Sequence, residues 1–214
     1  MPIIDLTIPM QDGLIESCPG EPRGHFMPFA SIAQNGWASH QLLLYTHGGT
    51  HLDAPSHFIA NASDVAALSL EAMIGPAFVA DVTVDDDQTF TVDDIRWPRP
   101  PQAGERVLLR TGWEKRRGTP EYFTRSPHLG LDVAQYAVDR QLTLIGLDLP
   151  TPNRQFPREV HQILLGAGIL LIEALINLTA IEEPEGVLTC LALPLVGMDG
   201  SPVRAVWSTP ATSR

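Results

Sequence analysis

The chain has 214 residues, of which 44% are apolar and 18% charged, and its formal net charge is −11 at pH 7. This composition is typical of a globular protein with a sizeable core, and the longest apolar runs fall well short of the roughly 20 residues that span a membrane. An acidic surface repels phosphate backbones, which argues against a nucleic-acid partner. Because no basic segment followed by an apolar one opens the sequence, we expect a cytoplasmic protein with no membrane partner.

Strand signals dominate the chain and are interspersed with a few helix signals. Segments rich in leucine or β-branched residues predict strands at 3–7, 41–46, 78–84, 106–111, 142–148, 169–175 and 187–195. Helices are predicted at 64–73, at 132–140 with Asp132 as the cap, and at about 158–165. This order predicts one layered α/β or α+β domain over residues 1–214.

Three further features are interpreted as structural. The proline-rich stretch 97–101 is expected to be a surface loop within the domain, and the acidic run 85–87 a solvated turn. Cys190 lies in an apolar strand signal and is expected to be an inert core thiol. The two cysteines, Cys18 and Cys190, lie far apart in sequence and give no disulfide framework.

The densest chemistry lies in residues 47–57, which contain three of the seven histidines together with one aspartate. If this segment is extended, side chains at 47, 49, 51 and 53 point to the same side, and Gly49 leaves room there. His47, His51 and Asp53 then form a ligand set for Zn²⁺ with one position open for water, and Mn²⁺ or Fe²⁺ also fits. The structural alternative is a histidine-rich loop whose rings bind backbone groups.

His57 follows Pro55, which turns the chain away from regular strand pairing. The ring of His57 is therefore expected to approach the same point from another direction. A histidine beside a metal-activated water is suited to proton transfer because its ordinary pKa is near neutral.

A second half of the site is predicted around His161 and Glu173. A carboxylate in the apolar run at 169–175 is costly to bury unless a cation or a hydrogen-bond donor pairs with it. On one helix the two residues would lie about 18 Å apart, but the break at 166–168 can bring a returning strand beside His161. Alternatively, His161 is a capping or surface residue and Glu173 pairs with an arginine. Five protein ligands exceed what one Zn²⁺ usually takes, which raises the possibility of two ions.

Residues 47–57 fit the pattern His-x-Gly-Thr-His-x-Asp-x-Pro-x-His at each fixed position. With this motif the chain resembles the metal-dependent cyclase-type hydrolases that include bacterial kynurenine formamidase. Weaker matches follow in the expected order at 5–7, 9–10, 19–20, 111–113, 127–129, 146–148 and 161–166, leading to Glu173.

The resemblance implies a swivelling β/β/α-type domain with a mixed, barrel-like β core, assembled as a homodimer or a larger oligomer such as a homotetramer. It implies Zn²⁺ or Mn²⁺ on His47, His51 and Asp53, with His161 and Glu173 serving a second ion in two-metal members. His57 matches the family's proton donor and acceptor. The implied substrates are small molecules, either N-formyl aryl amines or cyclic amides such as isatin.

Two positions depart from the family pattern. Cys18 stands before Pro19 where relatives often carry an aromatic residue, so Cys18 and Pro19 are candidates for lining an altered substrate pocket. Arg154 stands where relatives often have an acidic residue, and it either meets a substrate carboxylate or is a surface residue. The additional histidine His40 is interpreted as structural.

The main functional hypothesis is metal-assisted hydrolysis of an amide or lactam, with His57 moving the proton. A second hypothesis is a cyclase, isomerase or dehydratase that uses the same metal to stabilise an enolate. A third is a non-catalytic binding module stabilised by the metal. Incorporation of solvent oxygen into the product separates the first from the second, and an exchangeable metal-site water argues against the third.

Overall fold

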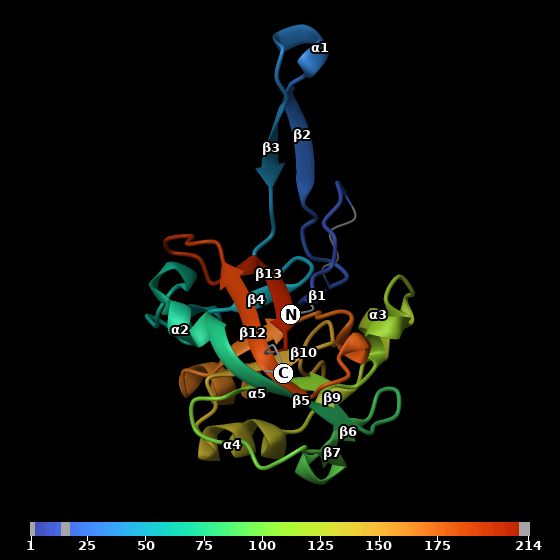
Figure 1. Cartoon of the computed structure of the whole chain (residues 1–214), viewed down its shortest axis with the longest axis vertical. Helices are drawn as coiled ribbons and strands as arrows, with labels where there is room; N and C mark the ends of the chain where they lie inside the picture. Colours follow the sequence, from blue (N-terminus) through green and yellow to red (C-terminus); the bar gives the residue numbers. More distant parts are fainter. Residues whose placement is uncertain (1–2, 14–17, 210–214) are drawn as a thin grey trace, which may run out of the picture.

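The body of the computed structural model, which describes residues 3–13 and 18–209, is a closed β-barrel from which a long hairpin extends (Figure 1). In order around the barrel, its strands are β13 (Gly200–Ser208), β12 (Glu185–Ala192), β5 (Ile74–Val82), β8 (Arg106–Arg110), β10 (Leu144–Leu147), β11 (Leu170–Glu173) and β4 (His51–Asp53). Pairing of β13 with β4 closes the barrel. The contacts among β5, β8, β10 and β11 are parallel and the others antiparallel. The α/β class and the mixed, barrel-like core are therefore confirmed.

The parallel part of the barrel is buried on both faces, as expected for strands that read as continuous apolar runs. Val107 and Leu109 of β8 pack outward beneath the helices, whereas Leu108 packs into the barrel interior. This alternation follows from the two-residue period of a strand. Trp207 of β13 fills the interior from the opposite wall and is fully buried.

Two helices cover the outside of the barrel, α4 (Leu131–Asp139) and α5 (Pro157–Gly166), close to the predicted bounds. The predicted cap is wrong, because Gly130 is the N-cap and the Asp132 carboxylate accepts the backbone N–H of Val92 instead. The single helix expected at 64–73 is also wrong. Two caps divide that segment, Asp64 for a 3-10 turn (Val65–Ala67) and Ser69 for α2 (Leu70–Met73).

Six of the predicted strands correspond to β1 (Ile3–Asp5), β5, β8, β10, β11 and β12. The strand predicted at 41–46 is displaced: β3 (Ser39–Leu43) ends earlier and pairs with β2 (His25–Ala30) in the protruding hairpin. The sequence missed β2, which contains Pro28 and no β-branched residue, and β13, which begins with Gly-Ser-Pro.

The remaining elements are short. They are β6 (Thr89–Phe90), β7 (Ile95–Arg96), β9 (His128–Leu129), α1 (Ile32–Asn35), α3 (Glu121–Thr124) and 3-10 turns at Pro55–His57, Val92–Asp94, Trp113–Arg116 and Leu178–Ala180.

The features interpreted as structural have clear places in the fold. Residues 97–101 form a loop, and the turn at 85–87 presents Asp86 to two arginines and Asp87 to a third. The Cys190 thiol is buried in β12, lies 3.1 Å from the carbonyl oxygen of Met73, and has its pKa raised to about 12 by burial. Within residues 3–13 and 18–209, no helix has the length and apolar character needed to cross a membrane.

Candidate metal centre

Strand β4 carries two of the predicted ligands between two strands from distant parts of the sequence. In the antiparallel register with β11, His51 lies opposite Glu173, and in the register with β13, Asp53 lies opposite Gly200. His51 and Asp53 are two residues apart and share one face of the strand, while Leu52 enters the core. Barrel closure thus brings Glu173 to the motif.

His47 reaches this face from a turn, which corrects the extended segment expected at 47–53. Regular strand geometry covers only residues 51–53, and Gly49 adopts a left-handed φ of 66° where the chain turns. The His47 ring nevertheless folds back, and its Nδ1 lies 2.8 Å from Asp53 Oδ1. Convergence therefore depends on a turn rather than on strand periodicity.

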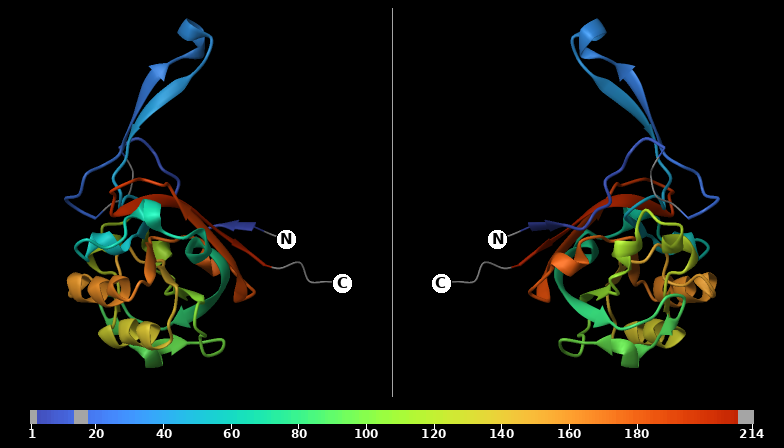
Figure 2. Two further views of the ribbon diagram at one scale, coloured as in Figure 1. Left: turned by 90° about the vertical axis from the view of Figure 1, so that its left-hand side faces the viewer. Right: turned by 90° about the vertical axis from the view of Figure 1, so that its right-hand side faces the viewer.

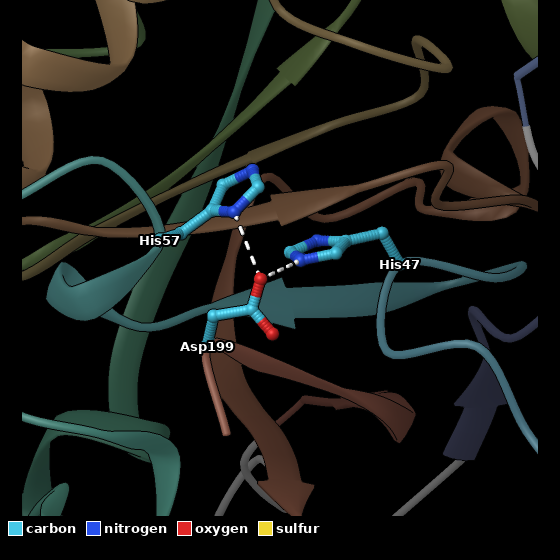
Figure 3. A group of neighbouring side chains, drawn as sticks. All are labelled: His47, His57 and Asp199. Carbon is cyan, nitrogen blue, oxygen red and sulfur yellow. Dashed lines mark hydrogen bonds and ion pairs between the residues drawn. The ribbon is translucent and has the colours of Figure 1, made fainter. Parts of the chain in front are cut away.

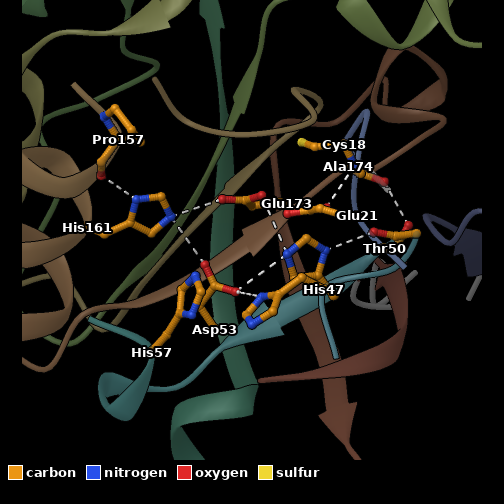
Figure 4. A network of polar contacts seen from close by, with 12 residues as sticks. Cys18, Glu21, His47, Thr50, Asp53, His57, Pro157, His161, Glu173 and Ala174 are labelled. Atoms are coloured by element: carbon orange, nitrogen blue, oxygen red, sulfur yellow. Dashed lines mark hydrogen bonds and ion pairs between the residues drawn. The ribbon is translucent and has the colours of Figure 1, made fainter. Parts of the chain in front are cut away.

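The two remaining predicted ligands meet across the α5–β11 connection (Figure 4). Helix α5 ends at Gly166, Gly168 adopts a φ of 77°, and β11 returns so that His161 Nε2 lies 3.2 Å from Glu173 Oε1. The same His161 Nε2 is 3.5 Å from Asp53 Oδ2. All these groups are buried, with Asp53 fully inaccessible.

His51 and His161 share a hydrogen-bonding pattern that fixes their rings. Nδ1 of His51 donates to the Gly49 carbonyl at 2.9 Å, and Nδ1 of His161 donates to the Pro157 carbonyl at 2.5 Å. In each neutral ring the lone pair is then on Nε2, which faces the carboxylates. Metal-binding histidines are usually oriented in this way by a carbonyl or carboxylate behind the ring.

Two buried atoms at the centre of the cluster provide a test of whether a metal fits. His51 Nε2 and Asp53 Oδ2 make no hydrogen bond, although His51 Nε2 lies 3.4 Å from both Asp53 Oδ1 and Glu173 Oε2. Buried polar atoms without partners are costly. Ligand atoms of His47, His51 and Asp53 lie within 4.8 Å of one another, as do those of Asp53, His57 and His161. The residues fit a divalent metal ion.

The charge state of the cluster reflects two buried carboxylates among histidines. Burial opposes ionisation of Asp53, but its close contacts with His161 and His47 outweigh burial and hold the pKa of Asp53 well below the usual value. Burial and the nearby Asp53 charge raise the pKa of Glu173. Burial also opposes charge on the histidines, yet contacts with Asp53 raise the pKa of His47 to about 9 and that of His161 to about 10. The carboxylates therefore attract cations strongly.

His57 lies beside the cluster and is held by an aspartate that the sequence did not single out (Figure 3). Asp199 Oδ2 lies 3.2 Å from His57 Nδ1 and 2.9 Å from His47 Nε2. The His47 and His57 rings stack with their centroids 4.0 Å apart. Burial lowers the pKa of His57, which favours the neutral ring at pH 7. These three residues also form a possible ligand group, so the geometry allows His57 either proton transfer or ligation.

Asp199 could not be found from local patterns because it belongs to no motif. It immediately precedes β13, and its backbone carbonyl accepts the N–H of Ala54 at 2.9 Å, which fixes it beside the motif. The sequence feature that could have indicated its position is β13, the strand that follows it, and this strand was not predicted.

The predicted substrate residues fall in different places. Cys18 lines a small pocket with His47 and His51, and burial followed by the Glu173 charge raises the pKa of its thiol to about 12. Pro19 lies in the exposed turn that follows. The guanidinium of Arg154 binds the Ser126 hydroxyl at 3.1 Å and the Asp87 carboxylate, so it is part of a loop contact outside that pocket.

A glutamate also missed by the sequence analysis, Glu21, contacts Cys18. The Glu21 carboxylate accepts the Cys18 backbone N–H at 2.9 Å and contacts the hydroxyl of Tyr45. The Tyr45 ring in turn meets the His47 ring edge-on, with centroids 5.7 Å apart. Burial, followed by the Glu21 charge, raises the pKa of Tyr45 to about 12 and keeps its hydroxyl protonated.

Comparison with known proteins gives consistent matches. A family model described as a putative cyclase matches residues 4–154. Kynurenine formamidase from Geobacillus thermodenitrificans is 35% identical over 176 residues, 77% of each chain, and that from Bacillus cereus (strain ATCC 14579) is 30% identical over 213 residues, 95% of each. The structure of isatin hydrolase A from Labrenzia aggregata, bound to benzyl benzoate, matches with a TM-score of 0.84 and 25% identity over 97% of this chain and 93% of that one. The chain therefore belongs to the cyclase family.

Proposed function

We propose that the protein is a metal-dependent amidohydrolase built from one domain, residues 1–214. The observation that carries this proposal is the buried convergence of His47, His51, Asp53, His161 and Glu173, with two central atoms lacking hydrogen bonds. Relatives named kynurenine formamidase and isatin hydrolase support an amide or lactam as the substrate class.

We assign His47, His51 and Asp53 to one ion, and His161 and Glu173 to a second ion where two are bound. Mixed imidazole and carboxylate ligands suit Zn²⁺ and Mn²⁺. When bound, such an ion lowers the pKa of water toward neutrality and polarises the substrate carbonyl. The remaining tasks of positioning and proton transfer belong to side chains of this chain.

His57 is the proposed proton shuttle. Its Nδ1–H donates to Asp199, which places the lone pair on Nε2, the nitrogen turned away from Asp199 (Figure 3). A neutral Nε2 can accept a proton from water and return it to the leaving nitrogen. Asp199 acts through His57 and His47 by fixing the orientation of both rings.

The proposed substrate is an N-formyl aryl amine such as N-formylkynurenine, or a related cyclic amide. Cys18 lines the pocket bordered by the cluster, and we propose that Cys18 and the following Pro19 shape substrate entry. Arg154 is already paired with Asp87, so we assign it to holding its loop rather than to binding substrate.

The test is turnover of N-formylkynurenine and of isatin in H₂¹⁸O by protein loaded with Zn²⁺ or Mn²⁺. Hydrolysis places one solvent ¹⁸O in the released formate or in the opened ring carboxylate. A product that carries no solvent oxygen would instead favour enolate chemistry of the cyclase or dehydratase kind. No turnover of a broad amide panel by metal-loaded protein would overturn the proposal.

We also propose that the enzyme is a homo-oligomer, a dimer or a tetramer. The support is the hairpin that stands away from the barrel with apolar side chains on its surface. Sedimentation equilibrium gives the mass, and a species of 23.3 kDa at all concentrations would contradict this assignment.

A further inference from the structure

The pocket that Cys18 lines beside the cluster is too small for the proposed substrates. Its cavity volume is about 10 Å³, which is room for roughly one water molecule. A cavity that holds a single benzene ring has a volume on the order of 150 Å³. An N-formyl aryl amine or a cyclic aryl amide therefore enters only if one wall of this pocket moves.

The inner wall of the pocket is fixed by the core of the protein. Tyr122 is buried, and its backbone carbonyl accepts the indole N–H of Trp113 at 3.0 Å. Ala174 is also buried and donates its backbone N–H to the carbonyl of Leu149 at 2.8 Å. Displacing either residue would disrupt close packing in the core, which is costly. The inner wall is therefore not the wall that opens.

The outer wall is a loop, residues 18–24, which contributes Cys18 to the pocket. Residues 18–24 form turns without a helix or a strand and run outside the barrel, at the foot of the hairpin of β2 and β3 (Figure 2). Pro19 is exposed, and the carbonyl of Gly24 accepts the N–H of Gly13, which belongs to the same connection between β1 and β2. This loop can therefore move without disturbing the barrel.

One carboxylate holds the loop against the pocket. Glu21 accepts hydrogen bonds from the backbone N–H of Cys18, at 2.9 Å, and from the side-chain hydroxyl of Tyr45. Figure 4 shows Glu21 beside Cys18, at the edge of the cluster. Tyr45 lies two residues before His47 and its ring packs edge-on against the His47 ring. The hydrogen bond from Tyr45 to Glu21 therefore ties the loop to the segment that carries the histidine motif.

We propose that Glu21 and Tyr45 are positioning residues that close the Cys18 loop over the site, and that substrate entry breaks the hydrogen bond between them. The bond stabilises the closed loop of the free protein. A substrate ring occupies space that the closed loop fills, so the loop is displaced and the bond is absent in the complex. The free energy of the bond therefore opposes substrate binding. The inference rests on the proposed function for the substrate, whereas the motion of the loop is measurable without it.

The motion is tested by the reactivity of the Cys18 thiol, which the closed loop shields. Excess iodoacetamide is added to the native wild-type protein and to Tyr45→Phe, and mass spectrometry follows each cysteine. The variant keeps the ring of Tyr45 and loses the hydroxyl. Labelling of Cys18 should accelerate about tenfold, the contribution expected of one hydrogen bond. Cys190, buried in β12, is the internal control and should stay unlabelled in both proteins. Equal rates at Cys18 would overturn the proposal.

Three further variants separate this closure from a local turn cap, since Glu21 also binds the Cys18 backbone. Glu21→Ala should label at Cys18 at least as fast as Tyr45→Phe. Glu21→Gln keeps an oxygen that accepts both hydrogen bonds, so its rate should lie closer to that of the wild type. Tyr136→Phe removes a hydroxyl on α4, at the end of the barrel opposite the hairpin, and should match the wild type. Acceleration by Glu21→Ala without acceleration by Tyr45→Phe would show that Glu21 only caps the turn.

Steady-state kinetics connects the motion to the reaction. In Tyr45→Phe the KM for N-formylkynurenine should fall about tenfold, since opening the loop no longer breaks a hydrogen bond. The change should appear in KM rather than in kcat, because the ring stays against His47. An unchanged or raised KM would overturn the link between this bond and substrate entry. Accelerated labelling of Cys18 with no turnover by any of these proteins would instead overturn the proposed function and leave the closure of the loop intact.

Discussion

The proposed metal-binding cluster and the arm, the hairpin formed by residues 25–43, depart from the usual distribution of residues in opposite directions. The cluster buries histidines and carboxylates that ordinarily face water, whereas the arm exposes phenylalanine, tryptophan and leucine that ordinarily pack inside. In the cluster, polar atoms lack partners that a cation would supply. On the arm, apolar side chains lack the cover that another chain would supply. Both departures point to a binding partner, and the residue types in each region indicate its chemistry.

The comparison is tested most strongly by two histidines, one from each region. His57→Ala should lower turnover about 10²–10⁴-fold, the usual contribution of a general acid–base group, while bound metal stays unchanged. His40→Ala removes an exposed imidazole on the arm and should leave turnover as it is. Steady-state kinetics with metal analysis of both variants checks this. Equal activity of the two variants would remove His57 from the mechanism.

The next prediction concerns Asp199, which contacts two histidines of the cluster, His47 and His57. Asp199→Asn keeps the shape of the side chain but removes the charge that holds the His47 and His57 rings, so activity should fall about 10–100-fold. The assay is run at saturating metal to separate turnover from metal affinity. Asp93→Asn, an exposed carboxylate on a 3-10 turn, is the control. A loss no greater than that of the control would show that Asp199 is not a positioning residue.

Metal affinity should rise with pH because protons and metal compete for the same nitrogens. The pKa values of about 9 for His47 and about 10 for His161 leave both rings protonated at pH 7, and metal binding requires them neutral. For each proton that metal binding displaces, the apparent affinity for the metal should rise about tenfold per pH unit, as long as the pH lies below the pKa of that histidine. Titration calorimetry in buffers of different ionisation enthalpy counts the protons. Affinity that is independent of pH between 6 and 8 would contradict this charge assignment.

A smaller effect is expected at Gly200, which lies against the cluster. A Cβ there would lie 2.8 Å from His47 Cε1 and 3.0 Å from the Leu52 carbonyl oxygen, so Gly200→Ala should displace the ring and cost about 1–3 kcal/mol. Gly166→Ala meets only Ile59 Cδ1, at an ordinary 3.6 Å, and should stabilise the fold by about 0.4–1 kcal/mol. Urea unfolding of both variants measures the contrast, which would be refuted if they shifted stability in the same direction.

The parts of the molecule that were predictable are those with a local signal. Residues 47–57 carry their chemistry within one segment, and apolar runs marked five barrel strands together with β1. Asp199 is one of 25 acidic residues, and its place depends on the pairing of β13 with β4, which no local pattern reveals. His47 was correctly placed in the cluster, but it reaches the cluster through a turn and not along an extended strand. Side-chain chemistry is easier to predict from sequence than the path of the backbone. The arm was missed because β2 contains a proline and no β-branched residue.

The central claim, that the buried cluster is a hydrolytic metal centre, is tested most directly by the metal content of the purified chain. Elemental analysis is made on untagged protein prepared without chelator, before and after dialysis against Zn²⁺ or Mn²⁺. The account predicts one or two equivalents per chain, with Asp53→Asn retaining much less. Protein that holds no metal and takes up none on dialysis would contradict the account and leave the cluster as a structural network of histidines and carboxylates.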